Sequence, residues 1–381
     1  PDCAQSHHCP DNRTICMNQM IARFAEEMRL TPQPMRWHGE GEVLTHTEMV
    51  VAELANVPGY SELTTRQKEI LTAAAWLHDI GKIRQTRRIG KEIEAPNHSS
   101  TGARMAREEL WLNHSLCGSR DAMQMREAIA ILVRYHSFPP HAIDSSDAKV
   151  RLHRIAANGL VAPDFSVKLL CMLSRADMMG RICDDKDEML DQISLCEELA
   201  KEEGCYESSY PFYSDYTRRA YLDGRHIWKS QELHNDTWGT VYMMSGLPGA
   251  GKDTWIRKYL SDIPMVSLDE IRRERKILPT ANQGLVANIA KEQAKEYLRE
   301  HQSFVWNATN LTQPMRQQLI SLFEGYKARV HIIYVETEWL TLLERNRSRE
   351  AAVPKSAIES MLGKLIPPEA YEATKVDWIT L

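Results

Sequence analysis

The sequence has no apolar run long enough to cross a membrane and no recognisable secretory signal. It also has no internal repeat and no low-complexity segment, which argues against a repeat architecture. An excess of positive charge is missing too. The formal net charge is −5, so any binding of nucleic acid has to come from local basic patches. Because no apolar run could cross a membrane, we expect no membrane partner.

Cysteine is present but forms no disulfide framework. Eight cysteines are scattered over 381 residues, as is typical of reduced thiols in a cytoplasmic protein. Three of them, Cys3, Cys9 and Cys16, crowd with histidines at the start of the chain. Their spacing matches no standard zinc pattern, so we interpret residues 1–17 as a flexible or loosely packed tail rather than a structural zinc site.

The length indicates two domains. Residues 18–201 show helical periodicity without strand alternation, which predicts an all-α domain. Within residues 238–381, predicted strands alternate with helices, as in an α/β domain with a parallel sheet. Residues 202–237 are rich in Tyr, Trp and Arg. We interpret them as a connector that packs one domain against the other, and the alternative is a stacking platform for single-stranded bases.

A predicted phosphate-binding loop follows the first strand of the α/β half. The stretch "GLPGAGKDTW" matches G-x-x-x-x-G-K between a predicted strand and a predicted helix. Backbone amides of such a loop surround phosphate oxygens, and Lys252 adds a charge at the β- and γ-phosphates. The predicted NTP-binding residues of the loop are Gly246, Gly249, Ala250, Gly251, Lys252, Asp253 and Thr254.

Asp253 stands where this loop usually has Ser or Thr, whose hydroxyl ligates Mg²⁺. A carboxylate is also a hard oxygen ligand, so it can serve Mg²⁺ directly or through water. It adds negative charge beside the triphosphate, which weakens nucleotide binding unless a metal neutralises it. Thr254 still offers a hydroxyl to the phosphates. We therefore expect altered metal handling rather than a dead site.

Polar residues after the next two predicted strands indicate phosphoryl transfer. Asp269 is placed to accept the proton of an acceptor hydroxyl, and Arg272 on the same turn can hold an acceptor phosphate. Asn307 and Asn310 follow the third strand, at the sheet edge where ligands bind.

Three arginines, Arg345, Arg347 and Arg349, follow the last predicted strand. On a helix, Arg345 and Arg349 share a face and could close over the transferring phosphoryl group as a lid. Taken alone, the same residues also fit a solvated basic helix face.

These motifs resemble the 5′-hydroxyl polynucleotide kinase domain of phage and bacterial end-healing enzymes. The resemblance covers the phosphate loop, the D-x-x-R turn at Asp269, the stretch 307–311 and the R-N-x-x-R stretch at 345–349. One acceptor-binding Asp of that family falls on Ala308 here, where Asn307 or Asn310 could replace it.

The kinase resemblance also implies roles for individual residues. Lys252 is implied to bind phosphate, and Asp269 to be the general base. Arg349 is implied to contact the nucleotide phosphates with Arg345 beside it, while Arg272 helps to hold the acceptor.

The all-α half carries His78 and Asp79 side by side, late on a predicted buried helix. Two adjacent groups that are costly to bury together indicate a metal site, whereas a lone histidine more often is a satisfied core residue. Gly81 then allows a turn, after which Lys82 can meet a phosphate.

This pattern resembles the HD phosphohydrolase superfamily, with its H…HD…D signature, over about residues 38–181. The resemblance implies one divalent metal held by His46, His78, Asp79 and Asp177. His98 and His136 stand where two-metal members have further ligands, with Asp79 then bridging; a surface or capping role is the alternative.

Other basic residues of this half have less specific readings. A group of arginines near the HD pair makes a plausible patch for a phosphate backbone, and four further histidines match no motif and are interpreted as structural or surface residues. They are Arg84, Arg87 and Arg88, and His38, His114, His141 and His153.

Together the two halves resemble the bacterial bifunctional HD-Pnk end-healing enzymes. The resemblance implies that the first domain removes a 2′,3′-cyclic, 2′- or 3′-phosphate, and that the second moves the γ-phosphate of ATP, GTP or another NTP to a 5′-hydroxyl. The implied cofactors are Mg²⁺ with the NTP and one or two divalent transition metals (Mn, Ni, Co, Zn, Cu or Fe type) in the HD site. The implied partners are RNA or DNA ends and a ligase that acts downstream.

Two alternatives stay open at the level of sequence. One is an HD-type nucleotide phosphohydrolase whose P-loop domain only senses NTP, with Asp253 and Ala308 as signs of lost chemistry. The other is a non-catalytic RNA-binding scaffold that reads RNA through its aromatic connector.

Overall fold

The computed structural model describes residues 17–278, 281–349 and 352–381. The interpretation of the Cys/His-rich start of the chain lies outside these residues. Five cysteines fall inside them, and all five are free thiols: Cys117, Cys171, Cys183, Cys196 and Cys205. Within the described part of the chain, no helix combines the length and apolarity that a membrane crossing requires.

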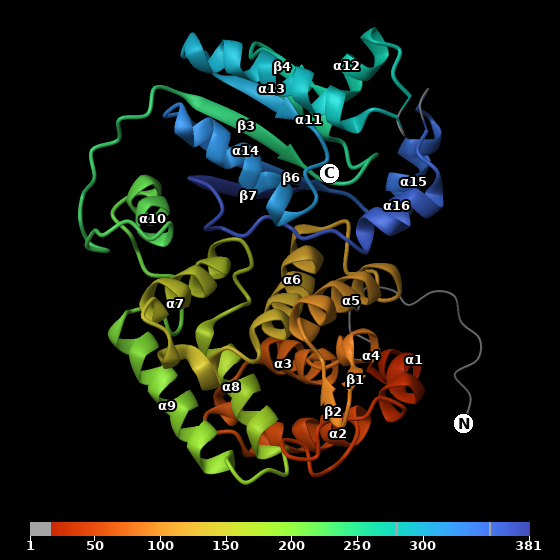
Figure 1. Cartoon of the computed structure of the whole chain (residues 1–381), viewed down its shortest axis with the longest axis vertical. Coiled ribbons are helices and arrows are strands. Elements are labelled where there is room, and N and C mark those ends of the chain that lie inside the picture. The colour runs from red at the N-terminus through yellow and green to blue at the C-terminus, as the bar shows by residue number, and fades with distance from the viewer. Residues whose placement is uncertain (1–16, 279–280, 350–351) are drawn as a thin grey trace.

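The N-terminal part is a helical bundle, which confirms the predicted fold class (Figure 1). Ser and Thr side chains cap three central helices: Thr64 forms a capping box with Gln67, and Ser119 and Ser166 each accept an amide hydrogen bond. The main helices are α1 (Met17–Arg29), α2 (Val43–Glu53), α3 (Thr65–Leu77), α5 (His98–Leu112), α6 (Arg120–Tyr135), α7 (Ala148–Ala156), α8 (Val167–Met179) and α9 (Lys186–Glu202).

Short elements connect these helices. One difference from the expected purely helical pattern is a small exposed antiparallel hairpin, whose strands β1 and β2 flank Gly90 at φ 62°. Three-residue strands are too short to show the alternation of apolar and polar residues, so the sequence pattern does not predict them. The short elements are η1 (Leu54–Asn56), η2 (Tyr60–Glu62), α4 (Lys82–Gln85), β1 (Arg87–Ile89), β2 (Glu92–Glu94), η3 (Pro139–Asp144) and η4 (Ala157–Leu160).

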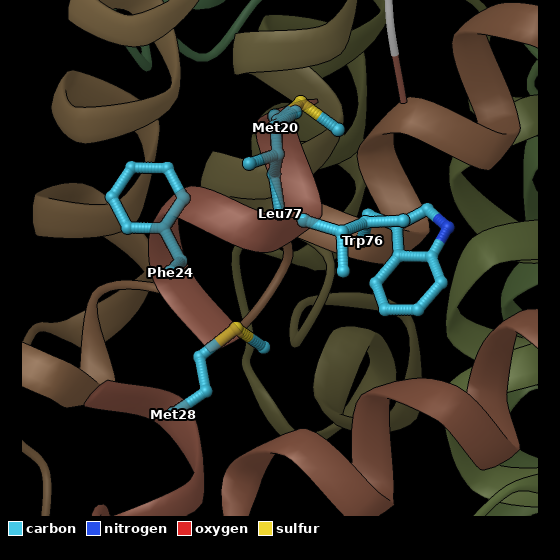
Figure 2. Close-up of a pocket in the computed structure, with 6 residues that line it drawn as sticks. Met20, Phe24, Met28, Trp76 and Leu77 are labelled. Atoms are coloured by element: carbon cyan, nitrogen blue, oxygen red, sulfur yellow. The ribbon is translucent and has the colours of Figure 1, made fainter. Parts of the chain in front are cut away.

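Helix α1 closes the bundle by packing on α3. Figure 2 shows Met20, Phe24 and Met28 of α1 around Trp76 and Leu77 of α3, where they line a small apolar cavity. Met20 and Met28 are almost fully buried, so this contact anchors α1 to the bundle by removing apolar surface from water.

The C-terminal part is built on a five-stranded sheet in the order β4-β5-β3-β6-β7, with every neighbouring pair parallel. This confirms the predicted parallel sheet. Helices cover both faces: α12, α13 and α14 pack on one face, and α11 packs on the other. The elements are β3 (Thr240–Ser245), α11 (Lys252–Tyr259), β4 (Met265–Ser267), α12 (Leu268–Glu274), α13 (Gln283–Arg299), β5 (Phe304–Asn307), α14 (Gln313–Gly325), β6 (Arg329–Glu336), α15 (Trp339–Arg347), α16 (Lys355–Leu362) and β7 (Lys375–Thr380).

Two elements of this part differ from the sequence reading. The predicted strand before Asp269 is short: it ends at Ser267, and a helix starts at once. The Ser267 side chain accepts a hydrogen bond from the Glu270 amide, and this N-cap moves Asp269 into the first turn of α12. Arg349 lies beyond the end of α15, so it does not share a helix with Arg345.

The connector carries one helix, α10 (Asp215–Leu222), beside both parts of the molecule (Figure 1). The α7 residue Arg154 donates to the Leu222 carbonyl. Towards the sheet, Arg219 pairs with Glu324 and donates to the Tyr371 carbonyl. These contacts favour the packing interpretation of the connector over the base-stacking one.

A buried ionic cluster joins the helical bundle to the sheet. Arg126 of α6 is fully buried, and its two terminal nitrogens each lie 2.8 Å from an oxygen of Glu336 at the end of β6. Its Nε donates to Glu127, which also binds Arg107. The Arg126 guanidinium lies over the Trp111 ring at 4.1 Å. All charges of the cluster are thus paired, which is the condition for burying them.

We predict that Arg126→Met lowers the free energy of unfolding by about 3–5 kcal/mol, because Glu336 would stay buried without its cation. The double variant Arg126→Met/Glu336→Gln should recover part of this loss. Urea denaturation followed by tryptophan fluorescence measures both. The exposed pair between Lys295 and Glu292 supplies the control, since Lys295→Met should leave the curve unchanged. A parental curve for Arg126→Met would contradict the role given to the cluster.

Candidate functional sites

Six of the sequence-predicted ligands come together inside the helical bundle. His46 lies on α2, His98 starts α5 and Asp177 lies on α8, whereas His78 and His136 are the residues that end α3 and α6. Asp79 follows His78 directly. All six are buried except His98, whose side chain is 23% exposed.

The backbone orients the histidines of this centre. The Nδ1 atoms of His78, His98 and His136 lie 2.7–2.8 Å from the carbonyl oxygen three residues earlier in the chain. His46 Nδ1 lies 2.9 Å from Glu40 Oε1. With Nδ1 facing these oxygens, each ring turns Nε2 toward the centre, the orientation of histidines that bind metals.

The inward-facing atoms form two groups that share Asp79. His46 and His78 make the first group with Asp79, and their Nε2 atoms lie 3.7 and 3.3 Å from Asp79 Oδ2. His98 and His136 make the second group, with Nε2 atoms 3.5 and 3.8 Å from Asp79 Oδ1. Asp177 adds to the first group, since its Oδ1 lies 3.0 Å from His46 Nε2. Asp177 is not a member of either group of three residues whose ligand atoms all lie within 4.8 Å of one another.

Two cations stand beside the carboxylates. Lys82 Nζ lies 2.7 Å from Asp79 Oδ2, and Arg181 donates to both oxygens of Asp177 at 2.9 Å. Burial alone would raise the pKa of Asp79, but the charges of Lys82 and His78 lower it well below its usual range. Burial would also raise the pKa of Asp177, but the charge of Arg181 lowers it well below its usual range. Both side chains are therefore carboxylates at neutral pH.

Burial keeps the second group of histidines neutral. It lowers the pKa of His136 to about 3, with the nearby charge of His78 acting in the same direction, and it also lowers the pKa of His98. A neutral imidazole is the form that binds a metal ion.

This donor set fits divalent metal ions. Oδ1 of buried Asp79 accepts no hydrogen bond, and Lys82 lies beside Oδ2, although an unpaired buried carboxylate oxygen is costly. Imidazole nitrogens and carboxylate oxygens around such a point are the ligands of Mn, Fe, Co, Ni, Cu and Zn ions. The two groups around Asp79 would accommodate one or two ions.

Sequence reasoning missed Glu40 and left His38 without a role. Glu40 Oε1 lies 2.9 Å from both His38 Nδ1 and His46 Nδ1, and its Oε2 accepts the Ile182 amide. Lys82 donates to Gln33 and lies 3.3 Å from His38 Nε2. A buried carboxylate behind a candidate ligand histidine is recognisable only once the two are seen together.

The remaining basic residues of this half take varied places. His153 is buried against Glu203, and His114 lies 3.3 Å from Glu109, which agrees with structural roles. His141 is exposed. Arg84, Arg87 and Arg88 are all exposed at or near the hairpin, and Arg87 lies 3.5 Å from Glu94 of the opposite strand.

In the sheet domain, the loop after β3 turns tightly over the end of β6. Gly246 has φ 140°, and a Cβ there would lie 2.3 Å from the Val335 carbonyl oxygen, so only glycine fits. Lys252 opens α11 and donates to the carbonyls of Gly246 and Leu247 at 2.9 Å. The loop thus places a cation at a helix N-terminus, as phosphate loops do.

Charged residues around the loop shift the pKa of Lys252. Burial lowers the pKa of Lys252 to about 8, and the charges of Asp253 and Asp269 oppose this shift while that of Arg349 adds to it. A bound phosphate would raise the pKa again by stabilising the ammonium.

Asp253 has a fixed orientation. Its Oδ1 accepts a hydrogen bond of 2.7 Å from Asn307 Nδ2 at the end of β5. Asn307 is 8% exposed, and its amide therefore positions the carboxylate that replaces the usual hydroxyl. The neighbouring Thr254 is exposed and accepts a hydrogen bond from Arg257.

Asp269 stands between two arginines. Arg272 Nη1 donates to its Oδ1 at 2.9 Å, and Arg349 Nη2 lies 3.6 Å from its Oδ2. The Asp269 side chain is 68% exposed, so an acceptor can reach it. Arg345 approaches the phosphate loop, with Nη1 3.3 Å from the point where a Cβ of Gly251 would stand.

The structure does not bring Asn310 to an open surface. It is 2% exposed, and its side-chain amide donates to the Met244 carbonyl at 2.7 Å. This hydrogen bond ties the segment after β5 to β3, beside the loop.

Two comparisons with protein families match these two parts. Residues 42–164 match the model of the HD domain, and residues 241–368 match the model of an AAA domain, which is a P-loop domain. The chain carries an HD domain and, after it, an AAA domain. The first match implies divalent-metal binding and phosphohydrolase chemistry, and the second implies NTP binding by a kinase-like domain. Asp177 lies beyond the matched residues of the HD domain.

We predict that Mn²⁺ raises the melting temperature of the protein in a concentration-dependent way, because a ligand that binds only the folded state stabilises it. At about a hundred times the Kd the gain is about 2.7 kcal/mol. Thermal unfolding with and without Mn²⁺ measures the shift. His78→Gln should lose most of it. His153→Gln, which removes another buried histidine, should melt earlier but keep the shift. Equal shifts in all three proteins would contradict the site.

Proposed function

We propose that the chain heals broken nucleic-acid ends. Its HD domain would remove a 2′,3′-cyclic, 2′- or 3′-phosphate, and its AAA domain would phosphorylate a 5′-hydroxyl with an NTP. The observation that carries the kinase part is the exposed Asp269 between Arg272 and Arg349, within reach of the charge of Lys252. A domain that only binds NTP does not need an accessible carboxylate there. We place the domains at residues 18–201 and 238–381, joined by residues 202–237.

In the kinase reaction, Asp269 accepts the proton of the 5′-hydroxyl as the hydroxyl oxygen attacks the γ-phosphorus, the bond from the γ-phosphorus to the β–γ bridging oxygen breaks, and the donor leaves as NDP. Arg272 and Arg349 pair with Asp269 in the structure, and both are placed to exchange this contact for phosphate groups. An acceptor phosphate would draw Arg272, and the NTP would draw Arg349 and Arg345. Substrate binding would thus free the base at the moment when it is needed.

The Asp253 carboxylate, held by Asn307, is placed to serve the Mg²⁺ of the NTP. This Mg²⁺ would neutralise charge on the β- and γ-phosphates. Lys252 would neutralise further charge on these phosphates. Its pKa of about 8 without ligand implies that phosphate binding completes its protonation.

In the phosphoesterase reaction, His46, His78, Asp79 and Asp177 would hold one metal ion, and Asp79, His98 and His136 would hold a second one. Such ions supply Lewis acidity and an activated water for in-line attack at phosphorus. Lys82 would leave Asp79 for a non-bridging oxygen once the charge of Asp79 is shared. A 2′,3′-cyclic phosphate exists only on a sugar with a 2′-oxygen, so RNA ends are the favoured substrate, and a ligase would act on the products.

A doubly modified RNA tests the two activities separately. The substrate has a 5′-hydroxyl and a 2′,3′-cyclic phosphate, and both ends are followed by gel mobility and mass with NTP, Mg²⁺ and Mn²⁺ present. We expect the parent to convert both ends. Lys252→Ala should lose only 5′ phosphorylation, and His78→Ala should lose only 3′ processing, because the sites share no residue. Loss of neither activity in either variant would contradict the assignments.

Asp253→Ser distinguishes the kinase from an NTP sensor. If the domain only senses NTP, the parent binds NTP without transfer and the serine variant gains activity. We expect the opposite order: the parent transfers label from γ-labelled NTP, and Asp253→Ser changes its dependence on Mg²⁺ concentration. Asp269→Asn should abolish transfer and preserve NTP binding, since its role is in proton transfer.

A further inference from the structure

The HD centre contains a second cation, half-buried, to which neither the sequence motifs nor the family match assign a role. Arg181 follows α8 and donates from Nη2 to both oxygens of Asp177, at 2.9 Å each. The pair resembles that of Lys82 with Asp79 on the other side of the centre. Each candidate ligand carboxylate thus has its own cation.

Arg181 lies between Asp177 and solvent. The Asp177 side chain is 3% exposed, while that of Arg181 is 19% exposed, the second-highest value after His98 among the side chains of the centre. Its Nε is buried without a hydrogen-bond partner. Since a buried unpaired donor is unusual in folded proteins, this atom is ready for an acceptor that arrives from outside.

The backbone aims Arg181 at the centre. The residue before it, Gly180, touches α2 so closely that a Cβ would lie 2.6 Å from the Val50 amide nitrogen. The residue after it, Ile182, is fixed by its amide to Glu40 and by its carbonyl to the Gly39 amide. Because the residues on both sides of Arg181 are held in this way, its backbone is fixed and its guanidinium is pre-organised for a ligand.

We propose that Arg181 is a phosphate-binding residue of the HD site. It contacts a non-bridging oxygen of the substrate phosphoryl group through Nε and Nη2, in the forked geometry that arginine makes with phosphate. The assignment rests on the proposed phosphoesterase function. Asp177 holds Arg181 in place before the substrate binds, and Lys82 meets the phosphoryl group from the side of Asp79.

Inorganic phosphate is the probe for this contact. Calorimetry measures phosphate binding to protein saturated with Mn²⁺, and a separate titration measures Mn²⁺ binding. We expect Arg181→Gln to weaken phosphate binding by about tenfold or more with Mn²⁺ stoichiometry unchanged, because one charge-assisted contact is lost. Arg181→Lys should recover part of the affinity. The control is Arg175→Gln on the same helix, where Arg175 pairs with Glu197 away from the centre.

Three outcomes would overturn the proposal. They are parental phosphate affinity in Arg181→Gln, loss of Mn²⁺ binding in both Arg181 variants, and no phosphate binding by the parent. Failure of the end-healing function looks different. If the parent binds phosphate and hydrolyses p-nitrophenyl phosphate but leaves RNA ends unchanged, the substrate class is wrong, while the Arg181 contact is upheld by weakened phosphate binding in Arg181→Gln.

Discussion

The ion pair between Arg126 and Glu336 is the contact on which both sites rest. Arg126 lies in the middle of α6, and the residue that caps the end of the same helix is His136, a candidate metal ligand. Glu336 ends β6, and the carbonyl oxygen of the residue before it lies so close to Gly246 of the phosphate loop that only glycine fits there. Charge buried at this depth tolerates little displacement, because separated ions would face an apolar interior. The helical bundle and the sheet are therefore held in one arrangement, with the frame of each site anchored to the other.

The HD centre solves a second problem of buried charge. Two carboxylates and four imidazoles face one another. The Nδ1 atom of each imidazole already lies beside a backbone carbonyl or Glu40. Without an ion, Lys82 and Arg181 offset the negative charge. The same cations are the natural partners of a phosphoryl group. A centre in which phosphate-binding cations pair with the ligand carboxylates is suited to a phosphoester substrate. This pairing links the metal chemistry to the end-healing proposal.

The sequence was informative where chemistry is local. The phosphate loop, the His78-Asp79 pair and the alternation of strands and helices are short-range patterns, and the fold class follows from them. The boundaries of β4 and α15 were not predictable, because the Ser267 cap and the end of a helix are decided by single hydrogen bonds. Glu40, Arg181 and the Arg126–Glu336 pair were not predictable either. Their partners lie on other elements, so their roles appear only when the chain is folded.

The most direct test of the whole account is a sealing assay. A broken stem-loop RNA with a 2′,3′-cyclic phosphate and a 5′-hydroxyl at the break is incubated with the protein, NTP, Mg²⁺ and Mn²⁺. A ligase that requires 3′-hydroxyl and 5′-phosphate ends is then added. The account predicts sealed RNA with the parent protein. Unsealed RNA, under conditions in which the ligase seals the same RNA with ready-made ends, would contradict it.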